Sequence, residues 1–327
     1  MLDSYNRNID YLRISVTDRC NLRCMYCMPS EGVEFLNHNE ILNYDEIIKV
    51  CQAAVKLGFK KIKITGGEPL VRKDVLGLIK DIKSLEGIEN ITITTNGVLL
   101  AENMEGLYKA GIDSINVSLD TLNRELYKQI TRRDELENVK KGLLEALKYP
   151  SVALKVNCVP MGLEGQSLTD VAALAKEYPI HVRFIEIMPI GWGKNYRFLS
   201  EEEIKDLIVK EFGLDEMVLY KEKLGNGPCR YYKADGFKGK IGFISAISHK
   251  FCGDCNRVRL TSTGFLKTCL QYDTGMDLKA VLRNGFGDEE MLLETIKEAI
   301  YKKPDGHRFL TTDIKDENIL GMSQIGG

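Results

Sequence analysis

The sequence predicts an α/β fold, in which a partial (β/α)6 barrel of the TIM type is followed by a smaller C-terminal α+β domain that covers its mouth. From residue 11 to about 190, short β-branched runs alternate with longer stretches of helical periodicity, as in parallel strands joined by crossover helices. Beyond Pro189 the pattern changes to one helix and a β-rich stretch from about Cys229 to Leu270. We therefore expect a barrel domain over residues 1–190 and a second domain over residues 191–327.

The expected barrel strands are short and differ from ordinary buried strands. Strands that are buried on both faces consist almost only of Val, Ile and Leu, whereas these also carry cations and hydroxyl groups. Segments such as YDEIIKVCQAAVKLG lie between them, with apolar residues three and four apart and a final glycine, as in amphipathic helices. The six strands are YLRISVT from Tyr11, KIKIT from Lys61, ITITT from Ile91, SINVSLD from Ser114, LKVNCV from Leu154 and VRFIEIM from Val182.

The C-terminal part contains two further helical patterns. Ser200 and Glu203 have the spacing of a capping box, which predicts that a helix begins directly after Ser200. Residues 287–303 return to helical periodicity, and the chain then closes with ILGMSQIGG.

Composition excludes several classes of protein. With 44% apolar and 28% charged residues in 327, the chain has the make-up of a folded protein. Its net charge of -2 gives no overall positive charge of the kind that favours binding to nucleic acid. The N-terminal residues lack the apolar run of a signal peptide, and no stretch approaches the roughly 20 apolar residues of a membrane span. We expect a cytoplasmic protein that binds neither nucleic acid nor membrane.

Six of the nine cysteines fall into two groups of three. In a reducing compartment such groups indicate metal ligands rather than disulfides. A structural zinc site normally has four protein ligands, so the first group of three, with no fourth nearby, predicts an iron–sulfur cluster with one open iron. The second group, taken alone, is equally compatible with zinc and with an iron–sulfur cluster. The alternative is a zinc site completed by a distant residue, for which His249 is available to the second group. The groups are Cys20, Cys24 and Cys27, and Cys252, Cys255 and Cys269; Cys51, Cys158 and Cys229 are expected to pack in the interior.

The expected strands also carry isolated cations. A cation that faces the barrel interior is unfavourable unless an opposite charge is near, so an anionic ligand is expected. Arg257 and Arg259 stand two apart in an expected strand and could clamp phosphate oxygens together. Alternatively, each side chain reaches outward to solvent or pairs with a carboxylate such as Glu186. The four barrel cations are Arg13, Lys63, Lys155 and Arg183.

The first cysteine group, with Tyr26 just before its third cysteine, resembles the signature of the radical S-adenosylmethionine superfamily. Gly66-Gly67-Glu68-Pro69 after the second strand resembles that family's glycine motif. The resemblance implies a 4Fe-4S cluster whose open iron binds S-adenosylmethionine, which reduction cleaves to a 5′-deoxyadenosyl radical. It further implies that S-adenosylmethionine is bound by Tyr26, Gly67, Ser118 and Met188. Without the resemblance, Met188 would be expected to pack in the hydrophobic core.

From Arg13 to Gly326-Gly327, and especially in CNRVRLTSTGFLKTCL, the chain resembles the GTP 3′,8-cyclase family, lyases that begin molybdenum cofactor biosynthesis. The resemblance implies a second 4Fe-4S cluster on Cys252, Cys255 and Cys269, and catalytic roles for Arg257, Arg259, Gly326 and Gly327. Lys63 departs from the arginine that many relatives carry, and Arg72 is a weaker candidate. The implied GTP site is Arg13, Lys63, Thr94, Lys155, Arg183, Arg257 and Arg259.

The same resemblance implies the partners. A reductant such as flavodoxin or ferredoxin would supply electrons, and cyclic pyranopterin monophosphate synthase would take the product; a homodimer is compatible with it. Two rival functions remain at this stage: a radical S-adenosylmethionine enzyme that modifies peptides, and a zinc-dependent module that binds RNA or protein.

Overall fold

The computed structural model describes residues 1–197, 199–284, 288–309 and 325. Its strands form one 12-stranded sheet in the order β12-β11-β10-β1-β2-β3-β4-β5-β6-β9-β8-β7. The sheet curves but stays open, because its two edge strands, β12 and β7, are not paired with each other. The α/β class and the partial barrel are therefore confirmed.

The six predicted strands form the centre of this sheet. Each runs parallel to the next one along the chain, as right-handed βα units require. Their bounds are β1 (Tyr11–Ser15), β2 (Lys61–Thr65), β3 (Asn90–Thr95), β4 (Ser114–Ser118), β5 (Ala153–Cys158) and β6 (His181–Ile185).

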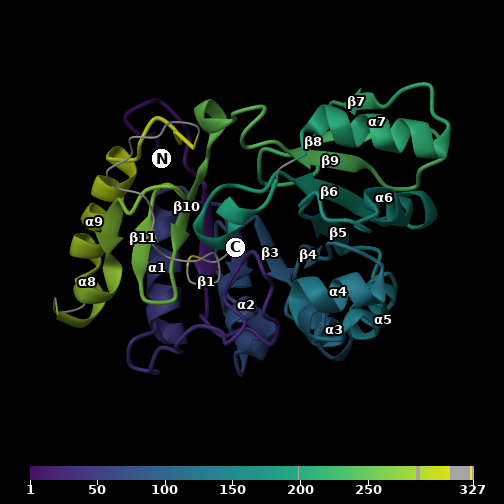
Figure 1. Cartoon of the computed structure of the whole chain (residues 1–327). Coiled ribbons are helices and arrows are strands. Elements are labelled where there is room, and N and C mark those ends of the chain that lie inside the picture. Colours follow the sequence, from purple (N-terminus) through teal and green to yellow (C-terminus); the bar gives the residue numbers. More distant parts are fainter. Residues whose placement is uncertain (198, 285–287, 310–324, 326–327) are drawn as a thin grey trace.

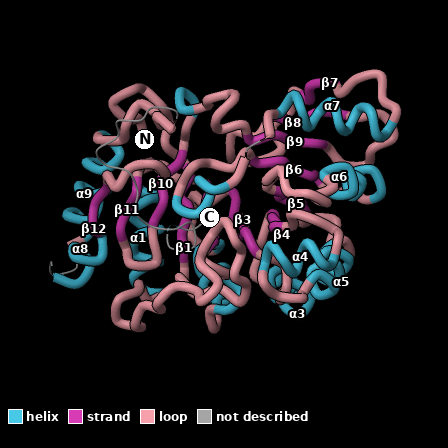
Figure 2. The backbone as a smooth tube through the Cα atoms, in the orientation of Figure 1, coloured by secondary structure: helices cyan, strands magenta, loops and turns pink. Residues whose placement is uncertain are grey.

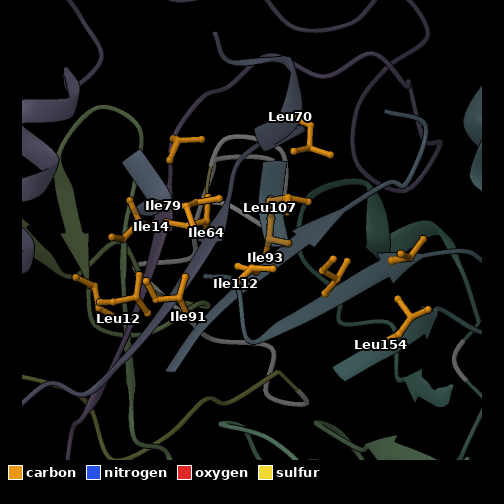
Figure 3. Close-up of a cluster of buried hydrophobic side chains, with 14 of the residues drawn as sticks. Leu12, Ile14, Ile64, Leu70, Ile79, Ile91, Ile93, Leu107, Ile112 and Leu154 are labelled. Carbon is orange, nitrogen blue, oxygen red and sulfur yellow. The ribbon is translucent and has the colours of Figure 1, made fainter. Parts of the chain in front are cut away.

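The connecting helices cover the outer face of the sheet. Leu12, Ile14, Ile64, Ile91 and Ile93 point outward from the strands and pack with Ile79 and Leu107 of the helices (Figure 3). Because side chains alternate along a strand, the residues between these apolar ones face the inside of the curved sheet. The helices are α1 (Tyr44–Lys56), α2 (Val75–Lys83), α3 (Leu100–Lys109), α4 (Arg124–Thr131), α5 (Leu136–Ala146) and α6 (Leu168–Glu177).

The C-terminal strands continue the same sheet at both of its edges (Figure 1). At one edge β9 (Ile241–Ile244) pairs parallel with β6, and antiparallel β8 (Arg230–Lys233) and β7 (Val218–Tyr220) follow it. At the other edge β10 (Arg257–Leu260) pairs parallel with β1, and antiparallel β11 (Phe265–Lys267) and β12 (Gly275–Asp277) follow. The division into residues 1–190 and 191–327 stays a prediction.

The C-terminal helices flank these added strands (Figure 2). As predicted, α7 (Glu201–Phe212) begins after a capping box in which Ser200 and Glu203 satisfy each other's backbone N–H groups. Helix α9 (Glu289–Tyr301) lies within the predicted range 287–303, whereas β7, β12 and α8 (Leu278–Asn284) were not predicted from the sequence. In the residues with described structure, no helix has the length and apolarity needed to span a membrane.

Candidate active site

One cavity of about 770 Å³ occupies the inside of the curved sheet. This volume is ample for a nucleotide-sized ligand. Side chains from all six central strands line the cavity, together with residues from both C-terminal edges. Both cysteine groups and the isolated strand cations reach it.

The two cysteine groups lie at opposite ends of the sheet. Cys20 comes after the carboxyl end of β1. Cys255 comes just before β10, whose first residue, Arg257, lies opposite Tyr11, the first residue of β1. Cys269 follows antiparallel β11 and so returns to the same end as Cys255. Any ligand between the two groups must therefore lie along the inside of the barrel.

The first cysteine group is half-buried, and two N–H donors lie near one of its sulfurs. The Leu22 N–H and the Asn96 side-chain amide lie 3.4 and 3.8 Å from the Cys20 sulfur. Burial raises the pKa of Cys24 well above its usual value, and the neighbouring Cys27 raises it further. Three such thiols lose their protons readily only when a metal binds them, which makes this donor set suitable for an iron–sulfur cluster.

Gly67 lies against the backbone of the loop that carries Cys20. A Cβ atom on Gly67 would stand 2.4 Å from the Arg19 carbonyl oxygen, and the Gly67 N–H donates to the Thr17 oxygen at 2.7 Å. Only glycine allows this approach. The next residue, Glu68, accepts hydrogen bonds from the Thr95 hydroxyl and the Asn96 N–H, which ties the glycine motif to the end of β3.

A row of three cations crosses the inner face of the sheet. Arg259 on β10 lies opposite Arg13 on β1, and Arg13 lies opposite Lys63 on β2. Burial lowers the pKa of Lys63 well below its usual value, and all the other groups that shift it, Arg183, Arg13, Lys155 and Arg257, are cations that lower it further. An anionic ligand would relieve this repulsion.

Two further cations face the row from the other side of the barrel. Burial, and then the charge of Arg183, lowers the pKa of Lys155 to about 8. Arg183 is held by amide oxygens, since its guanidinium donates to Asn116 at 2.6 Å and to Asn157 at 2.8 Å. Glu186, the alternative partner, instead accepts the N–H groups of Ile247 and Ser248. Glu186 is therefore engaged by backbone N–H groups, and Arg183 is held by neutral amides.

The second cysteine group lies among positive charges. Burial alone would raise the pKa of Cys255, but the charges of Lys303 and Arg257 lower it to about 7. The His307 N–H lies 3.5 Å from the Cys252 sulfur. The stabilised thiolate of Cys255 suits a metal cluster here as well.

Comparisons with known proteins agree with this arrangement. The family model of the radical SAM superfamily matches residues 14–178, and that of Molybdenum Cofactor Synthesis C matches residues 180–309. The chain is 44% identical over 330 residues to the GTP 3′,8-cyclase of Clostridium perfringens strain 13 and 46% identical over 332 residues to that of Desulforamulus reducens, with 100% of each chain covered.

The chain belongs to the GTP 3′,8-cyclase family. Among solved structures, Streptococcus suis SuiB bound to S-adenosylmethionine is similar with a TM-score of 0.63 at 16% identity, over 90% of this chain and 67% of SuiB. That likeness confirms the fold of the superfamily. Membership also confirms the predicted cofactors of the family, S-adenosylmethionine and 4Fe-4S clusters.

The residues predicted to bind S-adenosylmethionine lie at the same carboxyl end of the central strands as the first cysteine group. Tyr26, Gly67, Ser118 and Met188 all line the cavity. The structure also adds Asp120, which accepts a hydrogen bond from the Tyr26 hydroxyl at 2.8 Å and another from the Val159 N–H at 2.8 Å. The sequence places Asp120 after β4, but only the fold pairs it with Tyr26.

The residues predicted to bind the substrate of this family also converge. Arg13, Lys63, Thr94, Lys155, Arg183, Arg257 and Arg259 line the same cavity. The weaker candidate, Arg72, does not line it; its guanidinium donates to the carbonyl oxygens of Val16 and Leu42 and lies 4.2 Å from the Tyr44 ring centre. Arg72 thus has a structural role.

The zinc alternative finds no support at His249. This imidazole lies 3.7 Å from the carboxylates of both Glu201 and Glu202 and does not line the cavity. Within the described ranges, no three His, Cys, Asp or Glu side chains are arranged to hold a single metal ion. A four-iron cluster does not require such an arrangement, since each thiolate binds a different iron.

The remaining residues singled out from the sequence are three cysteines and the two terminal glycines. Cys51 and Cys158 are buried, as expected, whereas Cys229 lines the cavity. Gly326 and Gly327 lie outside the described residues, so their predicted role stays a prediction.

Proposed function

We propose that this chain converts GTP to (8S)-3′,8-cyclo-7,8-dihydroguanosine 5′-triphosphate, the first step of molybdenum cofactor biosynthesis. The observation that carries the proposal is the group of buried cations between two cysteine triplets in one cavity. Relatives named GTP 3′,8-cyclase, matched over the full chain, support it.

In this proposal each end of the cavity has its own task. Cys20, Cys24 and Cys27 hold one 4Fe-4S cluster, and Tyr26, Gly67, Ser118 and Met188 hold S-adenosylmethionine beside it. Cys252, Cys255 and Cys269 hold the other cluster. When bound, these groups supply one-electron chemistry that can remove a hydrogen atom from an unactivated carbon.

The chain's own contribution is binding and orientation. Arg13, Lys63, Lys155 and Arg183 neutralise the triphosphate, and Thr94 adds a hydroxyl group. Arg257 and Arg259 project from one face of β10 beside the second triplet, where they hold the nucleotide and assist the reaction. A nucleotide held in this way would lie between the two ends of the cavity, within reach of the residues that would hold S-adenosylmethionine.

We also propose the setting in which the reaction occurs. The protein works in the cytoplasm and receives electrons from a reductant such as flavodoxin or ferredoxin. Its product passes to cyclic pyranopterin monophosphate synthase, and a homodimer is compatible with this proposal. Gly326 and Gly327 would reach the cavity and assist hydrogen abstraction.

Anaerobic reconstitution tests this function. Two clusters correspond to about eight irons per chain and to absorbance near 400 nm. With dithionite, S-adenosylmethionine and GTP deuterated at C3′, the deuterium should appear in 5′-deoxyadenosine, and mass spectrometry should find the cyclised nucleotide. Stoichiometric zinc without absorbance near about 400 nm would contradict the proposal.

A further inference from the structure

Arg7 lies in a tight turn near the N-terminus that is buried against the second cysteine group. Asp3 organises this turn, since one of its carboxylate oxygens accepts the N–H groups of Tyr5 and Arg7, both at 2.9 Å. Its other oxygen accepts Nε of the Arg7 guanidinium at 2.6 Å. Asp3 and Arg7 are only 5% and 7% exposed, so the guanidinium is held in one orientation away from solvent.

The far side of the guanidinium donates to three backbone carbonyl groups. Nη1 donates to the Cys252 oxygen at 3.0 Å and to the Asp305 oxygen at 2.8 Å. Nη2 donates to the Pro304 oxygen at 2.6 Å. One side chain therefore joins a cysteine of the second triplet to the segment Lys303–His307, although neither is close to Arg7 in the sequence.

That segment is packed directly on the cysteines. A Cβ atom on Gly306 would lie 2.8 Å from Cβ and 3.1 Å from the sulfur of Cys252. The His307 N–H points at the same sulfur, and Lys303 Nζ donates to the carbonyl oxygen of Thr268, the residue before Cys269. Even a small shift of this segment would therefore displace Cys252 and the backbone next to Cys269.

We infer that Arg7 is a positioning residue for the second iron–sulfur cluster: with Asp3 behind it, its planar fork fixes the backbone of Cys252 and the segment that covers the triplet. The inference rests on the proposed function only in that the second triplet holds a cluster. Groups that orient ligands in this way typically matter for metal affinity almost as much as the ligands themselves. Lysine cannot replace Arg7, because one ammonium group cannot face Asp3 and three carbonyl groups in the same plane.

Two variants and a matched control test this role. Arg7→Lys removes the fork, and Asp3→Asn leaves the guanidinium in place but removes the charge that orients it. Arg283→Lys is the control, because Arg283 likewise joins a carboxylate, Glu46, to backbone carbonyl groups of Asn39 and Ile41, and none of these residues lines the cavity that both cysteine groups reach. Each purified holoprotein is assayed for iron, for the EPR spectrum of its reduced clusters, and for cleavage of S-adenosylmethionine without GTP.

We expect Arg7→Lys to lower the iron content from about eight toward about four per chain and to remove the EPR signal of the second cluster. Cleavage of S-adenosylmethionine should persist, because the first triplet is at the other end of the barrel. Asp3→Asn should shift or weaken the same signal, and Arg283→Lys should change neither measurement.

Wild-type iron content and an unaltered second-cluster signal in both variants would overturn the inference. If Arg7→Lys does not fold, the Asp3→Asn spectrum decides alone. Failure of the proposed function has a different signature, since the wild-type protein itself would then lack the second cluster.

Discussion

Arg13 and Arg259 lie opposite each other on the neighbouring parallel strands β1 and β10, and Lys63 lies on the far side of Arg13. Neighbouring strands are about 4.8 Å apart, so three positive charges share one stripe of the inner face. Burial lowers the pKa of Arg259 well below its usual value, and the charge of Arg13 lowers it further. The protein therefore keeps a repulsive arrangement that a polyphosphate would stabilise.

The first prediction concerns the two arginines of β10. Arg257→Ala and Arg259→Ala should each weaken GTP binding by about 1.5–3 kcal/mol if each arginine makes a charge-assisted hydrogen bond to the nucleotide. Calorimetry under anaerobic conditions measures the change. Arg124→Ala is the control, because Arg124 pairs with Asp134 at the surface. Unchanged affinity in both the Arg257 and the Arg259 variant would exclude these arginines from the nucleotide site.

Serine substitutions in the two cysteine groups should have different effects on the two reactions. Serine at Cys20, Cys24 or Cys27 should abolish cleavage of S-adenosylmethionine, because the first cluster loses a thiolate. Serine at Cys252, Cys255 or Cys269 should stop cyclisation of GTP and leave uncoupled formation of 5′-deoxyadenosine. Chromatography of both products checks this, with buried Cys51→Ala as control. Cyclisation at the parental rate in the second set would make that triplet structural.

GTP binding should take up protons near pH 8. The pKa of Lys155 is lowered to about 8 by burial and by Arg183, so the free protein is partly deprotonated there. A bound phosphate favours the charged amine and raises this pKa, so affinity should fall as the pH rises through 8. Calorimetry in Hepes and Tris, which differ in ionisation enthalpy, counts the protons. Lys155→Met should reduce the uptake and exposed Lys109→Met should not; equal heats in both buffers would contradict the prediction.

The Tyr26–Asp120 hydrogen bond should contribute to S-adenosylmethionine binding. Asp120 is buried and accepts from the Tyr26 hydroxyl at 2.8 Å, beside the first cysteine group. Tyr26→Phe and Asp120→Asn should each lower affinity by about 1.5–3 kcal/mol, and the double variant should lose little more than either. Equilibrium binding of S-adenosylmethionine to the wild type, the two single variants and the double variant gives the coupling free energy between the two side chains. Fully additive losses would show that the two groups act independently.

The terminal glycines give a separate prediction. Deletion of Gly326 and Gly327 should leave both clusters and S-adenosylmethionine binding intact while hydrogen abstraction from GTP fails. Anaerobic assay of 5′-deoxyadenosine and cyclised nucleotide tests this, followed by addition of a peptide that matches the last residues. Full activity of the truncated protein without the peptide would assign these glycines no catalytic role.

Local patterns were sufficient for much of the fold. Alternation along Tyr11–Ser15 and Lys61–Thr65 and helical spacing over Tyr44–Lys56 are properties of neighbouring residues, and the structure has strands and a helix there. The capping box at Ser200 is equally local. Short elements such as β7 and β12 were missed, because three residues form too short a run to show a periodicity.

By itself, the sequence determined the chemistry available to this protein: two groups of three thiols, a glycine motif and isolated cations within apolar strands. Residue types and short spacings carry that information. Only the tertiary structure decided where these groups meet. It placed β10 beside β1, which brings Arg259 to Arg13 and puts the two triplets at opposite ends of one cavity, and it brought Arg7 to Cys252. Such pairings depend on packing and register between distant segments, whose free energy no local stretch of sequence contains.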